Sequence, residues 1–286
     1  MNSLKNDTRP IGIFDSGLGG LTVARAVARA FPDEAICYLG DTARVPYGTK
    51  SAETVSLYAR EDMAFLLEHE AKILIAACNT VSAAALPHLR DQYNVPVMGV
   101  VEQGAEAVLE ALKGKDAPRI GVIGTETTIN SGAYREAIGK RAPAAGVAQK
   151  ACPLFVPLIE EGWIDHDVTR TVIREYLEPM RRDGIDALIL GCTHYPLIRE
   201  AFCDFFGPEV RIVDSAEAVV MALCKEFEAD RLRPAGGPGA ASRYFATDRY
   251  HRFRELVEAF MGRPDLDIRL IGSDALTEAL ERRKQP

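Results

Sequence analysis

The sequence predicts an α/β protein built from two pseudo-symmetric, doubly wound α/β domains. Three observations predict this class: short apolar runs alternate with longer amphipathic segments, the pattern restarts near the middle of the chain, and one strand-end motif occurs in both halves. A short apolar run bounded by turn residues is typical of a strand buried on both faces of a parallel sheet. Alternation with helical segments indicates crossover connections between such strands.

The composition is that of an ordinary globular protein. The chain has 286 residues, of which 47% are hydrophobic and 26% charged, and its length suits about two domains. Its net charge of −7 argues against nucleic acid as a general partner. The chain has no run of about 18 apolar residues and no apolar signal core at its start, so we expect no membrane association and a cytoplasmic location. The cysteines are then expected to be reduced.

The first expected strand, over residues 11–14, runs into a glycine-rich turn. The turn reads Asp15-Ser16-Gly17-Leu18-Gly19-Gly20, and a helix is expected over 21–30. Backbone N–H groups in such a turn suit an anion, but a tight turn that needs glycine for its backbone angles explains the pattern equally well. Asp15 is the distinctive residue, because a carboxylate at a strand end can act on protons.

The next strands lead to a polar loop and then to a thiol. A strand over 35–39 precedes the loop 40–48, and loops at this edge of a sheet tend to hold substrate. After a helix over 51–70, the strand 73–77 stops at Cys78. Asn79 and Thr80 follow as expected helix-capping residues. Ligands bind at such strand ends in open α/β sheets, so Cys78 is a candidate functional residue.

The second half repeats this construction. Residues 120–125 echo residues 11–16, and the strand 187–191 stops at Cys192. Similar spacing of the two motif pairs indicates an internal duplication, whose pseudo-twofold axis would place both cysteines across one shared cleft. We expect the first domain to combine residues 1–103 with 216–286 and the second to span 104–215.

The remaining elements follow from the same patterns. We expect the two acids Glu160 and Glu161 to begin a solvated helix. The further expected strands and helices are a strand at 97–101, helix 102–112, strand 148–152, helix 166–182, helix 197–206, strand 211–213, helix 216–228, strand 244–246, helix 251–261 and a closing strand 268–271. We interpret Cys37, Cys152, Cys203 and Cys224 as core thiols, and His69, His88, His166 and His251 as surface or structural residues.

Two facing thiols restrict the chemistry. A single strand-end cysteine is usually an inert core residue, but two at matched positions favour a function. A disulfide is disfavoured by the compartment, and a zinc site needs about four ligands, of which Cys192 and His194 supply two, so we expect no metal. A cysteine hydrolase would leave one thiol idle. The remaining possibility fits the pseudo-symmetry best: the two thiols act as acid and base on opposite faces of one carbon and invert it without a cofactor.

That chemistry needs assisting groups. A free thiol has a pKa of about 8.5, so a thiolate base at neutral pH needs a neighbouring group. Asp15 is placed to assist Cys78, and His194 to assist Cys192. Backbone N–H groups and polar side chains can neutralise a substrate carboxylate. The candidates for this role are Ser16, Asn79, Thr80 and Thr193.

Five stretches between residue 11 and about 215 together carry a resemblance to a known family. They read Ile-Phe-Asp-Ser-Gly-Leu-Gly-Gly, Asp-Thr-Ala-Arg-Val-Pro-Tyr-Gly, Ala-Cys-Asn-Thr, Cys-Pro-Leu-Phe-Val-Pro-Leu and Leu-Gly-Cys-Thr-His-Tyr-Pro-Leu. In these stretches the chain resembles the glutamate racemases of the cofactor-independent aspartate/glutamate racemase superfamily. The resemblance implies interconversion of L- and D-glutamate, with the D-isomer supplied to peptidoglycan synthesis, and a homodimer.

The resemblance also implies a role for each matching residue. Cys78 would handle the proton of D-glutamate and Cys192 that of L-glutamate, with Asp15 and His194 as auxiliary acid/base groups. Glu160 would tune His194. The implied substrate contacts are Asp15, Ser16, Pro46, Tyr47, Gly48, Asn79, Thr80, Thr125, Thr128, Thr193 and His194.

The resemblance is incomplete at two places. Gln103-Gly104 stands where the family pattern has Pro-Gly, at the expected interdomain hinge. The short segment ahead of Ile11 predicts no activation by a UDP-muramyl cell-wall precursor. Two alternatives stay open: racemisation of aspartate or another amino acid by the same thiol pair, and a non-catalytic amino-acid-binding regulator.

Overall fold

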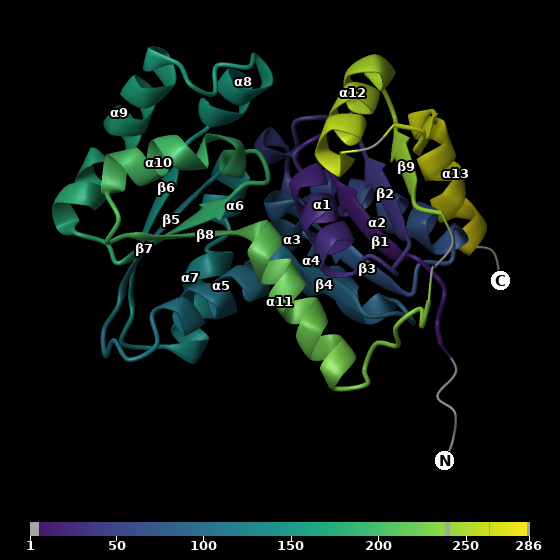
Figure 1. Ribbon diagram of the computed structural model, residues 1–286, viewed down its shortest axis with the longest axis horizontal. Helices are drawn as coiled ribbons and strands as arrows, with labels where there is room; N and C mark the ends of the chain where they lie inside the picture. The colour runs from purple at the N-terminus through teal and green to yellow at the C-terminus, as the bar shows by residue number, and fades with distance from the viewer. Residues whose placement is uncertain (1–5, 238–240, 263, 285–286) are drawn as a thin grey trace.

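The computed structural model describes residues 6–237, 241–262 and 264–284, and it contains two parallel β-sheets with helices on both faces of each (Figure 1). This confirms the predicted α/β class. The first sheet has the strand order β10-β9-β2-β1-β3-β4. Its strands are β1 (Ile11–Asp15), β2 (Ile36–Gly40), β3 (Ile73–Ala76), β4 (Val97–Gly99), β9 (Arg243–Ala246) and β10 (Asp267–Leu270).

The second sheet repeats the central topology of the first. Its order is β6-β5-β7-β8, formed by β5 (Arg119–Gly124), β6 (Gly146–Ala151), β7 (Ala187–Gly191) and β8 (Arg211–Asp214). In both sheets the first strand of the unit lies between the second and the third, so β1 corresponds to β5 and β3 to β7. Cys78 follows β3 and Cys192 follows β7, which gives the two thiols equivalent places in the two sheets.

Helices bury apolar residues against both faces of the first sheet. One core places Ile11, Ile13 and Ile75 against helices α1 (Leu21–Ala30), α11 (Ser215–Glu228) and α12 (Tyr250–Met261). The opposite core places Phe14 and Leu74 against α2 (Ala52–Glu68), α3 (Asn79–Ala84), α4 (Leu86–Leu89) and α13 (Ser273–Lys284). Burial on both faces explains why these strands are apolar throughout.

The second sheet is covered in the same way. Helices α8 (Phe155–Glu160), α9 (Asp167–Asp183) and α10 (Arg199–Phe206) pack on one face, and α5 (Val100–Ala111) and α7 (Ala133–Arg141) on the other. Helix α11 contributes Val219 and Leu223 to a core of the first sheet and Ala218 to a core of the second. The short helices are α6 (Glu126–Asn130), η1 (Tyr47–Thr49), η2 (Arg90–Gln92) and η3 (Tyr195–Ile198).

Several sequence expectations are wrong in detail. Cys78 itself is the N-cap of α3, and the Asn79 and Thr80 side chains make tertiary contacts instead of capping it. Glu160 ends helix α8 and does not begin a helix. Helix α13 was not expected, because its pattern is mostly polar. Cys203 is exposed and Cys224 half-buried, so neither is a core thiol.

The expected domain boundaries remain predictions. Residue 103 lies within α5, and residue 215 is the first residue of α11. Within the described ranges, no helix combines the length and apolar character needed to cross a membrane.

Candidate active site

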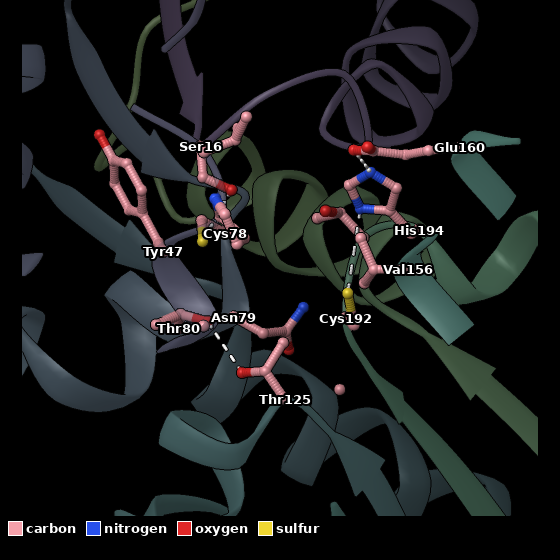
Figure 2. Close-up of a pocket in the computed structure, with 15 residues that line it drawn as sticks. Ser16, Tyr47, Cys78, Asn79, Thr80, Thr125, Val156, Glu160, Cys192 and His194 are labelled. Atoms are coloured by element: carbon pink, nitrogen blue, oxygen red, sulfur yellow. Dashed lines mark hydrogen bonds and ion pairs between the residues drawn. The ribbon is translucent and has the colours of Figure 1, made fainter. Parts of the chain in front are cut away.

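A cavity of about 40 Å³ lies where strand ends of the two sheets face each other. Its lining comes from the segments that directly follow β1, β2, β3, β5 and β7, from the last residue of β7 and from helix α8 (Figure 2). The lining residues are Ser16, Val45, Pro46, Tyr47, Gly48, Cys78, Asn79, Thr80, Thr125, Val156, Glu160, Gly191, Cys192, Thr193 and His194. This is the carboxyl edge of both sheets, where ligands bind in open α/β folds.

The two strand-end cysteines lie on opposite sides of this cavity (Figure 2). Cys78 is 4% exposed, and its sulfur is 3.7 Å from Ser16 Oγ. Burial, reinforced by the nearby Asp15 carboxylate, raises the pKa of Cys78 to about 12. In this geometry Cys78 therefore keeps its proton at neutral pH and is a proton donor.

Cys192 has a charged partner. Its sulfur lies 4.0 Å from His194 Nδ1, and His194 Nε2 forms an ion pair with Glu160 Oε1 at 3.4 Å. Burial alone would lower the pKa of His194, but the interactions with Cys192, Glu160 and Asp15 outweigh it and raise that pKa to about 10. The imidazole is therefore cationic at neutral pH and places a positive charge beside the Cys192 sulfur.

Glu160 reaches His194 from the last turn of α8. Its pKa is lowered, first by the hydrogen-bonding interaction with His194 and then by the positive charges of His194, Arg249 and Arg252. Arg249 Nη1 lies 3.7 Å from Glu160 Oε2, and Arg252 donates a hydrogen bond to the Glu160 carbonyl. Glu160 is thus an ionised group held between His194 and helix α12.

Asp15 lies behind the cavity and does not line it. Its Oδ2 atom accepts hydrogen bonds from the backbone N–H groups of Gly17 and Gly20 at 3.0 and 3.1 Å, so the anion bound by the glycine-rich turn is the protein's own carboxylate. Thr193 Oγ1 donates to Asp15 Oδ1 at 3.3 Å, which links the two sheets. Complete burial raises the pKa of Asp15, and the positive charge of His194 opposes this.

Three threonine hydroxyls form one hydrogen-bonded cluster beside the cavity. Thr80 Oγ1 is 3.0 Å from Thr125 Oγ1 and 3.4 Å from Thr128 Oγ1, and Thr125 and Thr128 are 3.0 Å apart (Figure 2 shows the Thr80–Thr125 bond). Thr128 supports the other two from behind and does not line the cavity. Because Thr80 follows β3 and Thr125 follows β5, this cluster also bridges the sheets.

The loop after β2 supplies Pro46, Tyr47 and Gly48 to the lining. The Tyr47 hydroxyl is turned away from the cavity, toward Asp41 and Asp62. Arg44 pairs with both of those carboxylates, at 2.5 and 3.3 Å, and also with Glu61. This buried ionic network fixes the loop from behind.

Most of the predicted site residues are brought together. Asp15 and Thr128 are the two that lie behind the cavity, and the other predicted residues line it. The sequence reading missed Val45, Gly191 and Val156. All three stand inside the family-like stretches quoted above, but as apolar residues or glycine they carry no chemistry that would mark them as site residues. In the part of the chain that the structure describes, no group of three or more His, Cys, Asp or Glu side chains is placed to hold a metal ion.

The sequence and the fold match one family. The Asp/Glu/Hydantoin racemase family model matches residues 20–223. The chain belongs to this family and is an isomerase of the racemase class. It is 49% identical over 264 residues to the glutamate racemase of Chlorobaculum tepidum and 46% identical over 263 residues to that of Syntrophus aciditrophicus. In each case 92% of this chain and 96% of the relative are covered.

Solved structures agree with this assignment. Glutamate racemase isoform RacE1 of Bacillus anthracis superposes with a TM-score of 0.85 at 35% identity, covering 92% of this chain and 97% of that chain. The glutamate racemase of Francisella tularensis in complex with D-glutamate gives 0.82 at 37% identity, covering 94% and 99%. These structures share the two-domain α/β architecture.

Proposed function

We propose that this protein is a glutamate racemase that interconverts L- and D-glutamate through Cys78 and Cys192. The observation that carries the proposal is the equivalent placement of the two cysteines, after β3 and β7, on opposite sides of one cavity. The close similarity to proteins named glutamate racemase, one of them solved with D-glutamate, supports glutamate as the substrate.

The two thiols divide the proton transfers between them. In the L-to-D direction the Cys192 thiolate takes the proton from Cα, and the Cys78 thiol gives its proton to the opposite face of the carbanion. The raised pKa of Cys78 and the cationic His194 beside Cys192 suit this starting state. In the reverse direction the roles exchange, with Cys78 acting on D-glutamate.

The polar groups of the cavity bind and neutralise the substrate. A carbanion next to a carboxylate needs nearby donors, which Ser16, Asn79, Thr80, Thr125 and Thr193 provide. The loop residues Pro46, Tyr47 and Gly48 contribute ring and backbone contacts, while Thr128 acts through Thr80 and Thr125. Asp15 and Glu160 act through Thr193 and His194, and the reaction uses no cofactor.

The biological role follows from the product. D-Glutamate would feed peptidoglycan synthesis, and with it cell-wall biogenesis and cell shape, in the cytoplasm. We propose a homodimer as the assembly. The two domains would be residues 1–103 with 216–286, and residues 104–215.

Incubation of pure L- or D-glutamate in deuterated water, without pyridoxal phosphate, tests the reaction. We expect inversion with deuterium entering at Cα, and loss of racemisation in Cys78→Ala and in Cys192→Ala. Full activity in both variants would refute the two-thiol mechanism. Faster turnover of aspartate than of glutamate would favour the related racemase, and binding of glutamate without any exchange would favour a regulator.

A further inference from the structure

Tyr134 is a buried tyrosine of helix α7 that does not line the cavity. Its hydroxyl donates a hydrogen bond of 2.6 Å to Asn79 Oδ1, and Asn79 Nδ2 donates to Ser215 Oγ at 3.1 Å. Burial raises the pKa of Tyr134, so the hydroxyl keeps its proton and remains a donor. The tyrosine thereby fixes which end of the Asn79 amide faces the second sheet.

The ring of Tyr134 is enclosed by two glycines. A Cβ atom at Gly191 would lie 3.2 Å from Tyr134 Cε2, and a Cβ atom at Gly104 would lie 3.2 Å from Cε1. Gly191 is the last residue of β7 and directly precedes Cys192, while Gly104 lies in α5 between β4 and β5. Both glycines leave room for the ring, so a side chain at either position would collide with Tyr134.

Tyr134 therefore contacts the immediate neighbours of both cysteines. Through its hydroxyl it binds Asn79, the residue after Cys78, and through its ring it contacts Gly191, the residue before Cys192. It also packs on the helix that connects the two sheets.

We propose that Tyr134 is a positioning residue that sets the separation of the two cysteine-bearing strand ends. This inference rests on the proposed two-thiol racemisation, because both sulfurs must reach the same Cα from opposite faces. Reacting atoms need to lie about 3–3.5 Å apart, and a misplacement of about 1 Å can cost roughly 10²-fold in rate. A tyrosine that links both strand ends holds this separation, whereas an ordinary core residue would only contribute stability.

The test compares Tyr134→Phe, which keeps the ring and deletes the hydroxyl, with Thr169→Val. Thr169 is buried in α9, outside the cavity, and its hydroxyl donates to the Trp163 carbonyl at 2.5 Å, so the control also loses one buried hydroxyl bond. We expect kcat for glutamate racemisation to fall roughly 10- to 100-fold in Tyr134→Phe, with little change in KM, and to stay at the wild-type value in Thr169→Val. Both variants should show similar melting temperatures.

A second readout does not depend on glutamate turnover. The alkylation rates of Cys78 and Cys192 by iodoacetamide, followed by mass spectrometry, should rise in Tyr134→Phe and not in Thr169→Val. Wild-type kcat and unchanged alkylation in Tyr134→Phe would overturn the proposal, as would equal losses in the two variants. If wild-type protein fails to racemise glutamate, the proposed function falls, and the alkylation rates still decide whether Tyr134 positions the thiols.

Discussion

The Nδ1 atom of His194 lies 4.0 Å from the sulfur of Cys192. Across the cavity, the sulfur of Cys78 has the Ser16 hydroxyl at 3.7 Å as its hydrogen-bond partner. Thr80 lies two residues after Cys78, just as His194 lies two residues after Cys192. The cationic imidazole of His194 therefore corresponds to the neutral hydroxyl of Thr80. The pseudo-symmetry of the fold therefore does not extend to the groups that assist the two thiols.

Replacing His194 should affect the Cys192 step more than the Cys78 step. In His194→Asn we expect kcat/KM to fall roughly 10²-fold or more, since a positioned acid–base group contributes about 10²–10⁴-fold. The fall must be equal in both directions, because enantiomers have equal free energies. The asymmetry appears in the primary deuterium isotope effect, which should be larger for Cα-deuterated L-glutamate, whose deuteron Cys192 removes, than for the D-isomer.

The isotope effects can be measured by circular dichroism with each deuterated enantiomer. His88→Asn is a suitable control, because His88 is exposed and does not line the cavity. Equal isotope effects for the two enantiomers in His194→Asn would contradict a selective role at Cys192.

The raised pKa of His194 also predicts a pH-dependent stability. Its pKa rises from an ordinary 6.5 to about 10 on folding, so its contribution to stability is complete below about pH 6.5 and is lost as the pH rises through 10. The free energy of unfolding of wild type should therefore fall, relative to His194→Asn, across this range. Urea unfolding at several pH values measures the difference in free energy of unfolding between the two proteins. The pH-dependent contribution of Cys78 to stability cancels in this difference, because both proteins contain Cys78. If the free energies of unfolding of the two proteins changed in parallel with pH, the raised pKa of His194 would be ruled out.

The features that depend on local sequence patterns could be predicted from the sequence alone. Helix 21–30 was expected from its periodicity and is observed at Leu21–Ala30. The strand-end positions of Cys78 and Cys192 followed from apolar runs that stop at a polar residue, and parallel topology then brings such ends to one edge. The repeated motifs likewise predicted two similar α/β units, and the two sheets do share the strand order β2-β1-β3-β4 and β6-β5-β7-β8.

Features set by contacts between distant residues were not predictable in this way. Asn79 was expected to cap a helix, but its amide bonds to Tyr134 and Ser215, which only the fold brings close. The local pattern around Glu160 predicted only a solvated helix start; its approach to His194, which the resemblance implied, depends on the packing of α8. Asp15 was expected to reach into the cleft, and the nearby N–H groups of the glycine-rich turn hold it behind the cavity.

Gly19 permits a close approach between the two sheets. A Cβ atom there would lie 2.7 Å from His194 Nδ1 and closer still to Thr193 Oγ1. Gly19 is not among the glycines of positive φ, so alanine would meet a steric obstacle and no backbone strain. We expect Gly19→Ala to displace Thr193 and His194 and to lower kcat roughly 10²-fold, because catalytic groups tolerate little displacement.

The matched control for this change is Gly139→Ala in helix α7, where an added Cβ meets nothing within 4 Å. Alanine should stabilise that helix by about 0.5–1 kcal/mol and leave racemisation unchanged. Steady-state kinetics and thermal unfolding of both variants separate the two effects. Wild-type kcat in Gly19→Ala would show that the approach of Thr193 and His194 to the glycine-rich turn is not required for turnover, whereas a loss confined to that variant ties the turn to the catalytic geometry of the opposite sheet.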